Sequence, residues 1–163
     1  MKEATNLWET APSVATFGDV ILSIPAGETL QANSSTVVQY PKLWGPYPSQ
    51  KPNQYVAITR LYDHDSTRNT FEPTDVYETR FGIRSVAYDP NKGIVINGEK
   101  VRIQGVNQHH DLGALGAAFN VRAAERQLEV LRELGCNAIR TSHNPPAPEL
   151  LDLTDRMGFL IIN

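Results

Sequence analysis

Two short polar clusters, each directly after a strand-like run, contain the residue types best suited to chemistry. One cluster consists of Asn107, His109, His110 and Asp111, and the other of Arg140, Ser142, His143 and Asn144. Imidazoles and carboxylates hydrogen-bond hydroxyl groups, and a guanidinium favours the ionised form of a nearby carboxylate. We therefore interpret the two clusters as parts of one binding site.

Each residue also has a purely structural interpretation. A single loop histidine such as His109 or His143 is most often a surface residue. Asp111 is suited to cap the glycine-rich loop that follows it, and Arg140 to pair with an acid from a helix. A binding site is favoured because the two polar clusters occupy equivalent positions, each directly after a strand-like run. Packing of a protein core alone does not require this arrangement.

Other kinds of site fit these residues less well. His109, His110 and Asp111 adjoin one another, but successive side chains near a strand point apart, so we expect no metal site. Ser142 and His143 are also adjacent and lack a G-x-S-x-G elbow, which argues against a nucleophile and its base. The loop LGALGAA lacks the spacing of a dinucleotide-binding fingerprint.

The second half of the chain alternates strands and helices. Asn97-Gly98 predicts a hairpin with a type I′ turn between 94–96 and 101–103. Asn120 as N-cap and Gly135 after the last turn delimit a helix through Leu134. A strand at Asn137–Thr141, a helix opening near Pro146–Pro148 and ending at Gly158, and a strand at Phe159–Ile162 complete the series.

This alternation predicts parallel strands, because strand–helix–strand units place successive strands in the same direction. Sites in such folds form at the carboxyl ends of the strands. If neighbouring strands pair, the clusters that begin at Asn107 and Arg140 lie side by side.

The first half is expected to be all-β. Its β-branched or aromatic runs, separated by breakers, are Asp19–Ile24, Thr36–Tyr40, Tyr55–Tyr62 and Val76–Val86. Short turns between such runs are typical of a sheet or sandwich. We place the boundary between the halves near Val86–Gly93, which gives domains 1–88 and 89–163.

Composition limits the partners. The 163 residues are 40% apolar and 20% charged, which is globular, and the net charge of -3 argues against nucleic acid as a partner. The single cysteine, Cys136, excludes an internal disulfide and is expected to be a small buried apolar residue. No apolar run approaches the roughly 20 residues of a membrane span, and no signal peptide is visible, so no membrane is expected and the default compartment is cytoplasmic.

The segment from Gly105 to Asn163, GVNQHHDLGALGAAFNVRAAERQLEVLRELGCNAIRTSHNPPAPELLDLTDRMGFLIIN, strongly resembles glycoside hydrolase family 2 at the start of its catalytic barrel. NGEKVRIQG, YETRFGIRSV and PKLWGPYPSQKPNQYVAITRLY resemble the domain and junction before that barrel, most closely in β-galactosidase-like members. The resemblance implies a multi-domain β plus α/β fold: a partial immunoglobulin-like β-sandwich followed by the first βα units of a (β/α)8 TIM barrel. It also implies retaining hydrolysis of terminal β-galactosides or related β-glycosides.

The resemblance assigns roles by position. His109 and His143 match histidines that contact substrate hydroxyls, and Asp111 matches an acidic position that binds sugar hydroxyls in some relatives. Arg140 matches the arginine beside the nucleophilic glutamate, where its charge keeps that carboxylate ionised. Asn107 matches a site-lining or supporting position.

The sequence departs from the pattern of this family mainly in its catalytic carboxyls. A retaining glycosidase needs two carboxyls about 5–5.5 Å apart, and in the family both glutamates lie on later barrel strands, so we expect both beyond Asn163. No residue here is therefore expected to be catalytic, and the chain alone is expected to be inactive. No cofactor is expected in this segment; a divalent cation and a homo-oligomer are compatible with the parent enzyme.

A non-catalytic carbohydrate-binding or scaffold module is the alternative. Such a module would bind sugar saturably as a stably folded chain, and His143→Ala would abolish that binding. A part of a barrel enzyme would bind weakly or not at all.

Overall fold

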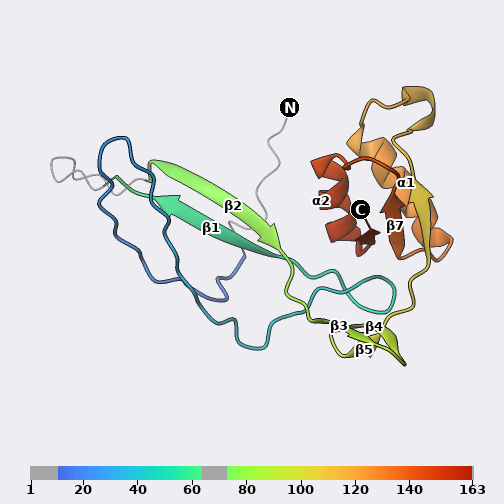
Figure 1. Ribbon diagram of the computed structural model, residues 1–163, viewed down its shortest axis with the longest axis horizontal. Helices are drawn as coiled ribbons and strands as arrows, with labels where there is room; N and C mark the ends of the chain where they lie inside the picture. The colour runs from blue at the N-terminus through green and yellow to red at the C-terminus, as the bar shows by residue number, and fades with distance from the viewer. Residues whose placement is uncertain (1–10, 64–72, 163) are drawn as a thin grey trace. The chain divides into compact units, whose positions relative to one another are not determined.

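A computed structural model describes residues 11–63 and 73–162 of the chain (Figure 1). Contacts divide it into two compact units, one ending at Pro41 and one beginning at Lys42, and each is described by itself. No helix in the described ranges is long and apolar enough to cross a membrane.

In the first unit, residues 11–41 contain neither helix nor strand. The expected strands Asp19–Ile24 and Thr36–Tyr40 are therefore wrong. Their apolar side chains face water instead of a core: Ile21 is 89% exposed and Tyr40 97%. A strand is stable only when a neighbour pairs with its backbone and covers one face, and the runs find neither in this unit.

The first two strands of the second unit pair antiparallel. Strand β1, Tyr55–Leu61, pairs with β2, Asp75–Phe81, and the rings of Tyr55 and Phe81 stack with centroids 5.9 Å apart. The expected strand over Tyr55–Tyr62 is confirmed to within one residue. The single strand expected over Val76–Val86 is instead two, because the ladder of β2 stops at Phe81 and β3, Val86–Asp89, joins another sheet.

That other sheet has three antiparallel strands in the order β3-β4-β5, with β4 at Gly93–Ile96 and β5 at Glu99–Lys100. Asn97 (φ 55°) and Gly98 (φ 82°) join β4 to β5 with positive φ at both turn positions, as a type I′ turn requires. The expected hairpin is confirmed, although its second strand pairs at 99–100 instead of 101–103.

The remaining elements form a parallel sheet in the order β6-β7-β8. In chain order they are β6 Gly105–Gln108, the short 3-10 helix η1 Gly113–Leu115, α1 Val121–Glu133, β7 Ala138–Thr141, α2 Pro148–Met157 and β8 Leu160–Ile162. Both β6–β7 and β7–β8 pair parallel, which confirms the two predicted strand–helix–strand units.

The helices begin and end where local signals predicted. Asn120 accepts a hydrogen bond from the Ala123 backbone N–H, so it caps the open N-terminus of α1. Gly135 has φ 85° just after that helix. Pro148 starts α2, and Gly158 ends it in a left-handed conformation.

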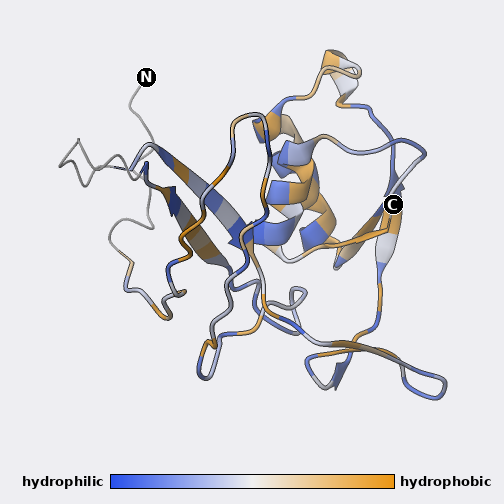
Figure 2. Cartoon of the chain, turned by 60° about the vertical axis from the view of Figure 1, so that its left-hand side comes forward, coloured by the Kyte–Doolittle hydropathy of each residue, from blue (hydrophilic) through white to orange (hydrophobic). Residues whose placement is uncertain are grey.

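One apolar core holds the two helices on the parallel sheet. Its buried members are Ala124, Leu128, Ile139, Leu150, Leu153 and Phe159. Figure 2 shows hydrophobic and hydrophilic residues alternating along the helices, as expected for helices with one buried face. Cys136 is half-buried and packs against this core, close to the expected apolar role.

The segment Lys42–Asn53, here called the strap, ties the parts of this unit together. The Trp44 indole N–H donates to the Asp155 carbonyl in α2 (2.8 Å), and the Tyr47 N–H donates to the Gly158 carbonyl (3.0 Å). Trp44 is 4% exposed. The indole therefore anchors the strap to the end of α2.

The chain after β2 is shaped to fit this indole. A Cβ on Gly82 would lie 2.6 Å from the Trp44 Cβ, so no larger residue fits there without a shift. The Arg84 guanidinium lies 4.7 Å from the centre of the Trp44 ring, a cation–π contact.

We expect Trp44→Phe to lower the free energy of unfolding by about 2 kcal/mol, because it removes the indole hydrogen bond and part of a buried ring. Urea denaturation of the 163-residue chain measures this. Tyr88→Phe is the control, because Tyr88 is 81% exposed. A Trp44→Phe variant as stable as the control would contradict the anchoring role of the indole.

The Asp155 side chain makes the stability of the fold depend on pH. The residue is exposed overall, but partial burial of its carboxyl raises the pKa of Asp155; nearby Arg84 opposes this rise and Asp152 adds to it. The folded state therefore binds the proton more tightly than the unfolded state. The stability from this group is greatest at low pH and is lost as pH rises through the raised pKa of the folded state.

We expect Asp155→Asn to be more stable than the parent chain above that pKa and to lose less stability between acidic and neutral pH. The backbone carbonyl that accepts from Trp44 is retained in this variant. Free energies of unfolding measured across this pH range test it. Parallel pH profiles for the two proteins would contradict it.

Candidate functional site

The parallel register of β6 and β7 brings the two polar clusters together. Asn107 pairs with Arg140, and Gln108 pairs with Thr141. Both strands therefore end at the same edge of the sheet, and the residues that follow them leave from neighbouring points. The expectation that the clusters lie side by side is confirmed by this pairing.

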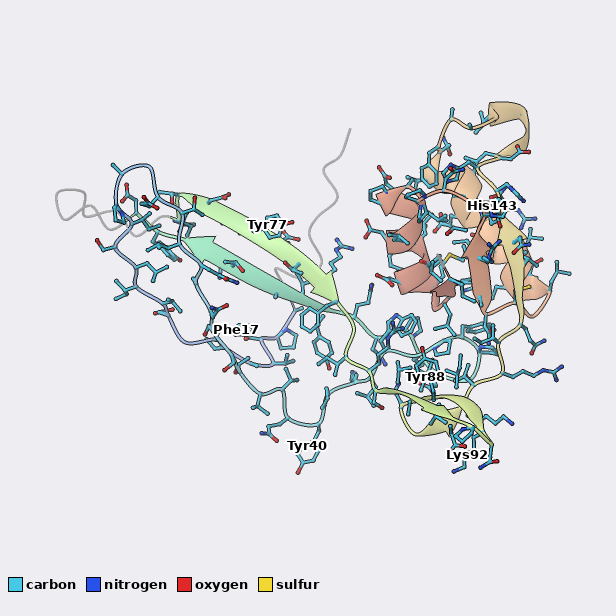
Figure 3. The ribbon with its side chains drawn as sticks, in the orientation of Figure 1. Phe17, Tyr40, Tyr77, Tyr88, Lys92 and His143 are labelled. Carbon is cyan, nitrogen blue, oxygen red and sulfur yellow. The ribbon has the colours of Figure 1, made fainter. Side chains whose placement is uncertain are left out.

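His109 and His143 meet just beyond the strand ends. Their ring centroids are 5.8 Å apart with an angle of 81° between the planes, an edge-to-face contact. Both residues are exposed, and in the described part of the chain neither imidazole has a hydrogen-bond partner. Figure 3 labels His143 near the end of the parallel sheet. The ring nitrogens are available to a ligand.

Arg140 is presented on the open face of the sheet. Ile139 is 0% exposed and Thr141 6%, while Arg140 between them is exposed, so its side chain faces away from the core. Its Nη1 donates to the Ser142 hydroxyl at 3.0 Å. Among the described residues no acid forms an ion pair with it, so the interpretation of Arg140 as the partner of a helix acid is wrong.

Asp111 has a structural role and also remains available. Its Oδ1 accepts a hydrogen bond from the Gly113 N–H at 2.7 Å, so it does cap the glycine-rich loop. Its other carboxylate oxygen has no hydrogen-bond partner in the described ranges. One oxygen therefore fixes the loop, and the other is able to accept from a ligand hydroxyl.

Two cavities open on either side of β6. One, of about 550 Å³, lies between the strand and α1 and is lined in part by Asn107, His109 and Asp111. The other, of about 380 Å³, lies over the open face of the sheet and is lined in part by Asn107 and Arg140. Four of the five predicted residues line a cavity, and Asn107 lines both; His143 contributes through its contact with His109.

The structure also shows how the residues considered for a nucleophile and for a metal site are placed. Ser142 is 2% exposed and its hydroxyl accepts from Arg140, so it is not presented as a nucleophile. No group of three or more His, Cys, Asp or Glu side chains is placed to hold a metal ion in residues 11–63 and 73–162.

Two glutamines beside the site were not predicted. The Gln108 side chain donates to Gln127 at 2.9 Å, and Gln127 donates to the backbone carbonyl of Asp111 at 3.0 Å. Neither has a sequence signature: Gln108 is a single glutamine at the end of a strand, and a glutamine on a helix, such as Gln127, is ordinarily solvent-exposed. In the sequence, only the position of Gln127 next to the apolar stripe of α1 could have indicated that its side chain contacts other residues.

Comparisons with known protein families agree with the fold of the chain. The family model for the TIM barrel domain of glycosyl hydrolases family 2 matches residues 89–163, and a second model of glycosyl hydrolases family 2 matches residues 5–84. The expected fold class, a β domain followed by the first βα units of a TIM barrel, is confirmed by these matches.

Individual relatives point the same way. Beta-galactosidase BoGH2A of Bacteroides ovatus is 46% identical over 138 residues, which are 85% of this chain and 15% of that protein. A beta-glucuronidase of Rattus norvegicus is 38% identical over 74% of this chain and 18% of its own length. The crystal structure of a beta-glycosidase from Bacteroides vulgatus superposes with a TM-score of 0.71 at 35% identity, covering 80% of this chain and 16% of that one.

The chain thus spans less than a fifth of the length of each of these three relatives. Two models of one family match consecutive parts of the sequence, and the parallel strands, with their paired polar ends, lie in the part that matches the barrel. The chain belongs to glycoside hydrolase family 2.

Proposed function

We propose that this chain supplies the sugar-recognising and electrostatic part of the active site of a retaining β-glycosidase. The substrates would be terminal β-galactosides or related β-glycosides. The observation that carries the proposal is the contact of His109 with His143 beyond two parallel strands whose partners Asn107 and Arg140 face each other. The β part before the barrel is assigned, on the sequence resemblance, to an immunoglobulin-like sandwich.

Sugar recognition needs hydrogen-bonding groups that converge without satisfying one another. The two imidazoles meet this need, because each ring can donate from one nitrogen and accept at the other. The unpaired oxygen of Asp111 accepts from a hydroxyl, and the Asn107 amide can do both. Together these groups suit a ring of vicinal hydroxyls better than an apolar or cationic ligand.

Arg140 has a different task in this proposal. A retaining glycosidase needs one carboxylate ionised, to attack the anomeric carbon, and one protonated carboxyl to assist the leaving group. A guanidinium within about 4–6 Å of a carboxylate favours the ionised form. Arg140 would hold the nucleophile charged, and its bond to Ser142 would keep the guanidinium on the open face of the sheet.

The chemical step is not assigned to residues of this site. Asp111 is the only acid lining either cavity of the described chain, and one of its oxygens caps the loop. A pair of facing carboxyls is required for double displacement. The proposal therefore gives the residues here binding and electrostatic roles and no acid/base or nucleophilic role.

The galactoside preference is supported by sequence identity. The Bacteroides ovatus relative named as a beta-galactosidase is 46% identical, against 38% for the Rattus norvegicus beta-glucuronidase. This difference in identity favours a galactoside as the substrate.

The second candidate is a non-catalytic carbohydrate-binding module, which the single carboxylate at the site favours. Titration of the 163-residue chain with methyl β-D-galactoside separates the two functions. Tight saturable binding that His143→Ala abolishes supports the module, whereas weak or absent binding supports a part of a barrel enzyme. Wild-type-like turnover of an aryl β-galactoside by this chain alone would contradict both.

A chimeric enzyme tests the proposed function. The 138 matching residues of this chain replace the corresponding ones in the Bacteroides ovatus enzyme, and hydrolysis of an aryl β-galactoside is measured. We expect an active chimera in which His143→Ala lowers kcat/KM about tenfold or more, because a hydrogen bond to the sugar is lost.

His110→Ala is the matched control. His110 is an exposed histidine that lines neither cavity and, unlike His143, makes no ring contact with His109 in the described part of the chain, so we expect a change of less than about twofold. Equal losses in the His110→Ala and His143→Ala chimeras, or a folded chimera without hydrolysis, would contradict the assignment of the site.

A further inference from the structure

We propose that Gln127 of α1 is a positioning residue that holds the loop carrying His109 and Asp111 against the end of β6. Its effect on sugar binding rests on the proposed function above. Its effect on the loop itself does not, and the two effects are measured separately below.

The side-chain amide of Gln127 bridges the helix, the strand end and the loop. Its Nε2 donates to the Asp111 backbone carbonyl at 3.0 Å, and its Oε1 accepts from Gln108 Nε2 at 2.9 Å. Each half of the amide therefore has one task. The donor half holds the loop, and the acceptor half is oriented by the last residue of β6.

Gln127 projects from a rigid element. Its neighbour Leu128 and the preceding Ala124 are both 0% exposed and belong to the core that fixes α1 on the sheet. On the other side, the Gln108 carbonyl accepts from the Ser142 N–H at 2.9 Å, which ties the end of β6 to β7. The bridge therefore joins the loop to two elements that cannot easily move.

The loop has few other ties. The remaining hydrogen bonds of residues 109–118 in the described chain stay inside the loop, among them Asp111 N–H to the His109 carbonyl and Gly113 N–H to Asp111 Oδ1. Outside these bonds, Leu112 packs against the core. Without Gln127 the loop would lose its hydrogen bond to the helix, so its internal hydrogen bonds would open more often and His109 would move relative to His143.

The direction of the bridge is also informative. Gln108 Oε1 is buried without a hydrogen-bond partner among the described residues. An unpaired buried acceptor costs free energy. The Gln108 amide nevertheless lies with Oε1 unpaired and with Nε2 donating to Gln127. This orientation leaves the Gln127 amide N–H free to donate to the Asp111 carbonyl.

Two variants separate the halves of the bridge. Gln127→Met removes both hydrogen bonds at nearly constant size. Gln127→Glu can still accept from Gln108, but it places a carboxylate against the Asp111 carbonyl oxygen, so only the loop contact is lost. Gln104→Met is the matched control, because Gln104 is an exposed glutamine outside the loop.

Nuclear magnetic resonance of the full 163-residue chain provides the loop readout. We expect about fivefold faster hydrogen exchange at the Gly113 amide in both Gln127 variants, and loss of the cross-relaxation between the His109 and His143 rings. The Gln104→Met variant should match the wild type in both measurements. If circular dichroism shows that the Gln127→Met variant does not fold, the Gln127→Glu variant alone tests the role of Gln127.

Hydrolysis of an aryl β-galactoside by the chimera described above is the second readout, with about fivefold lower kcat/KM expected for Gln127→Glu. If the chimera without this change does not hydrolyse the galactoside, the proposed function loses support, while the exchange and ring measurements still decide the role of Gln127. Unchanged Gly113 exchange together with an unchanged ring contact in both variants would overturn the proposal, whatever the sugar result.

Discussion

The parallel hydrogen-bonded register between β6 and β7 is the constraint on which the site depends. It sets Asn107 opposite Arg140 and leads both strands to one edge, so that His109 and His143 come into contact. A shift of this register by one residue would turn Arg140 toward the core and Ile139 toward water. The arrangement of the polar groups therefore follows from strand pairing, not from attraction among the groups themselves.

The apolar core enforces that register. Ile139 from β7 packs with Leu128 of α1 and Leu153 of α2, and all three are nearly fully buried. Each such side chain contributes about 1.5–3 kcal/mol when buried, which exceeds the net value of a single exposed hydrogen bond. The core thus fixes the backbone, and contacts such as that of Gln127 with Asp111 adjust a loop on a frame that is already set.

The barrel part was predictable because its signals are local. Asn120, Gly135 and Pro148 mark helix ends through backbone chemistry within a few residues, and the parallel pairing follows from the alternation of elements. The strands predicted at Asp19–Ile24 and Thr36–Tyr40 were wrong. A β-branched or aromatic run shows that a segment could form a strand, but it does not show that another strand is there to pair with it. The contacts of Trp44 with Asp155 and of Gln127 with Asp111 join residues without local signals, so only the structure shows them.

The proposed function requires that His109 and His143 act together on one sugar. A double-mutant cycle in the chimera measures this coupling by comparing kcat/KM for His109→Ala, His143→Ala and the double variant. Because the rings lie 5.8 Å apart, we expect losses that are not additive, with a coupling above about 0.5 kcal/mol. Additive losses, or no loss in either single variant, would contradict it.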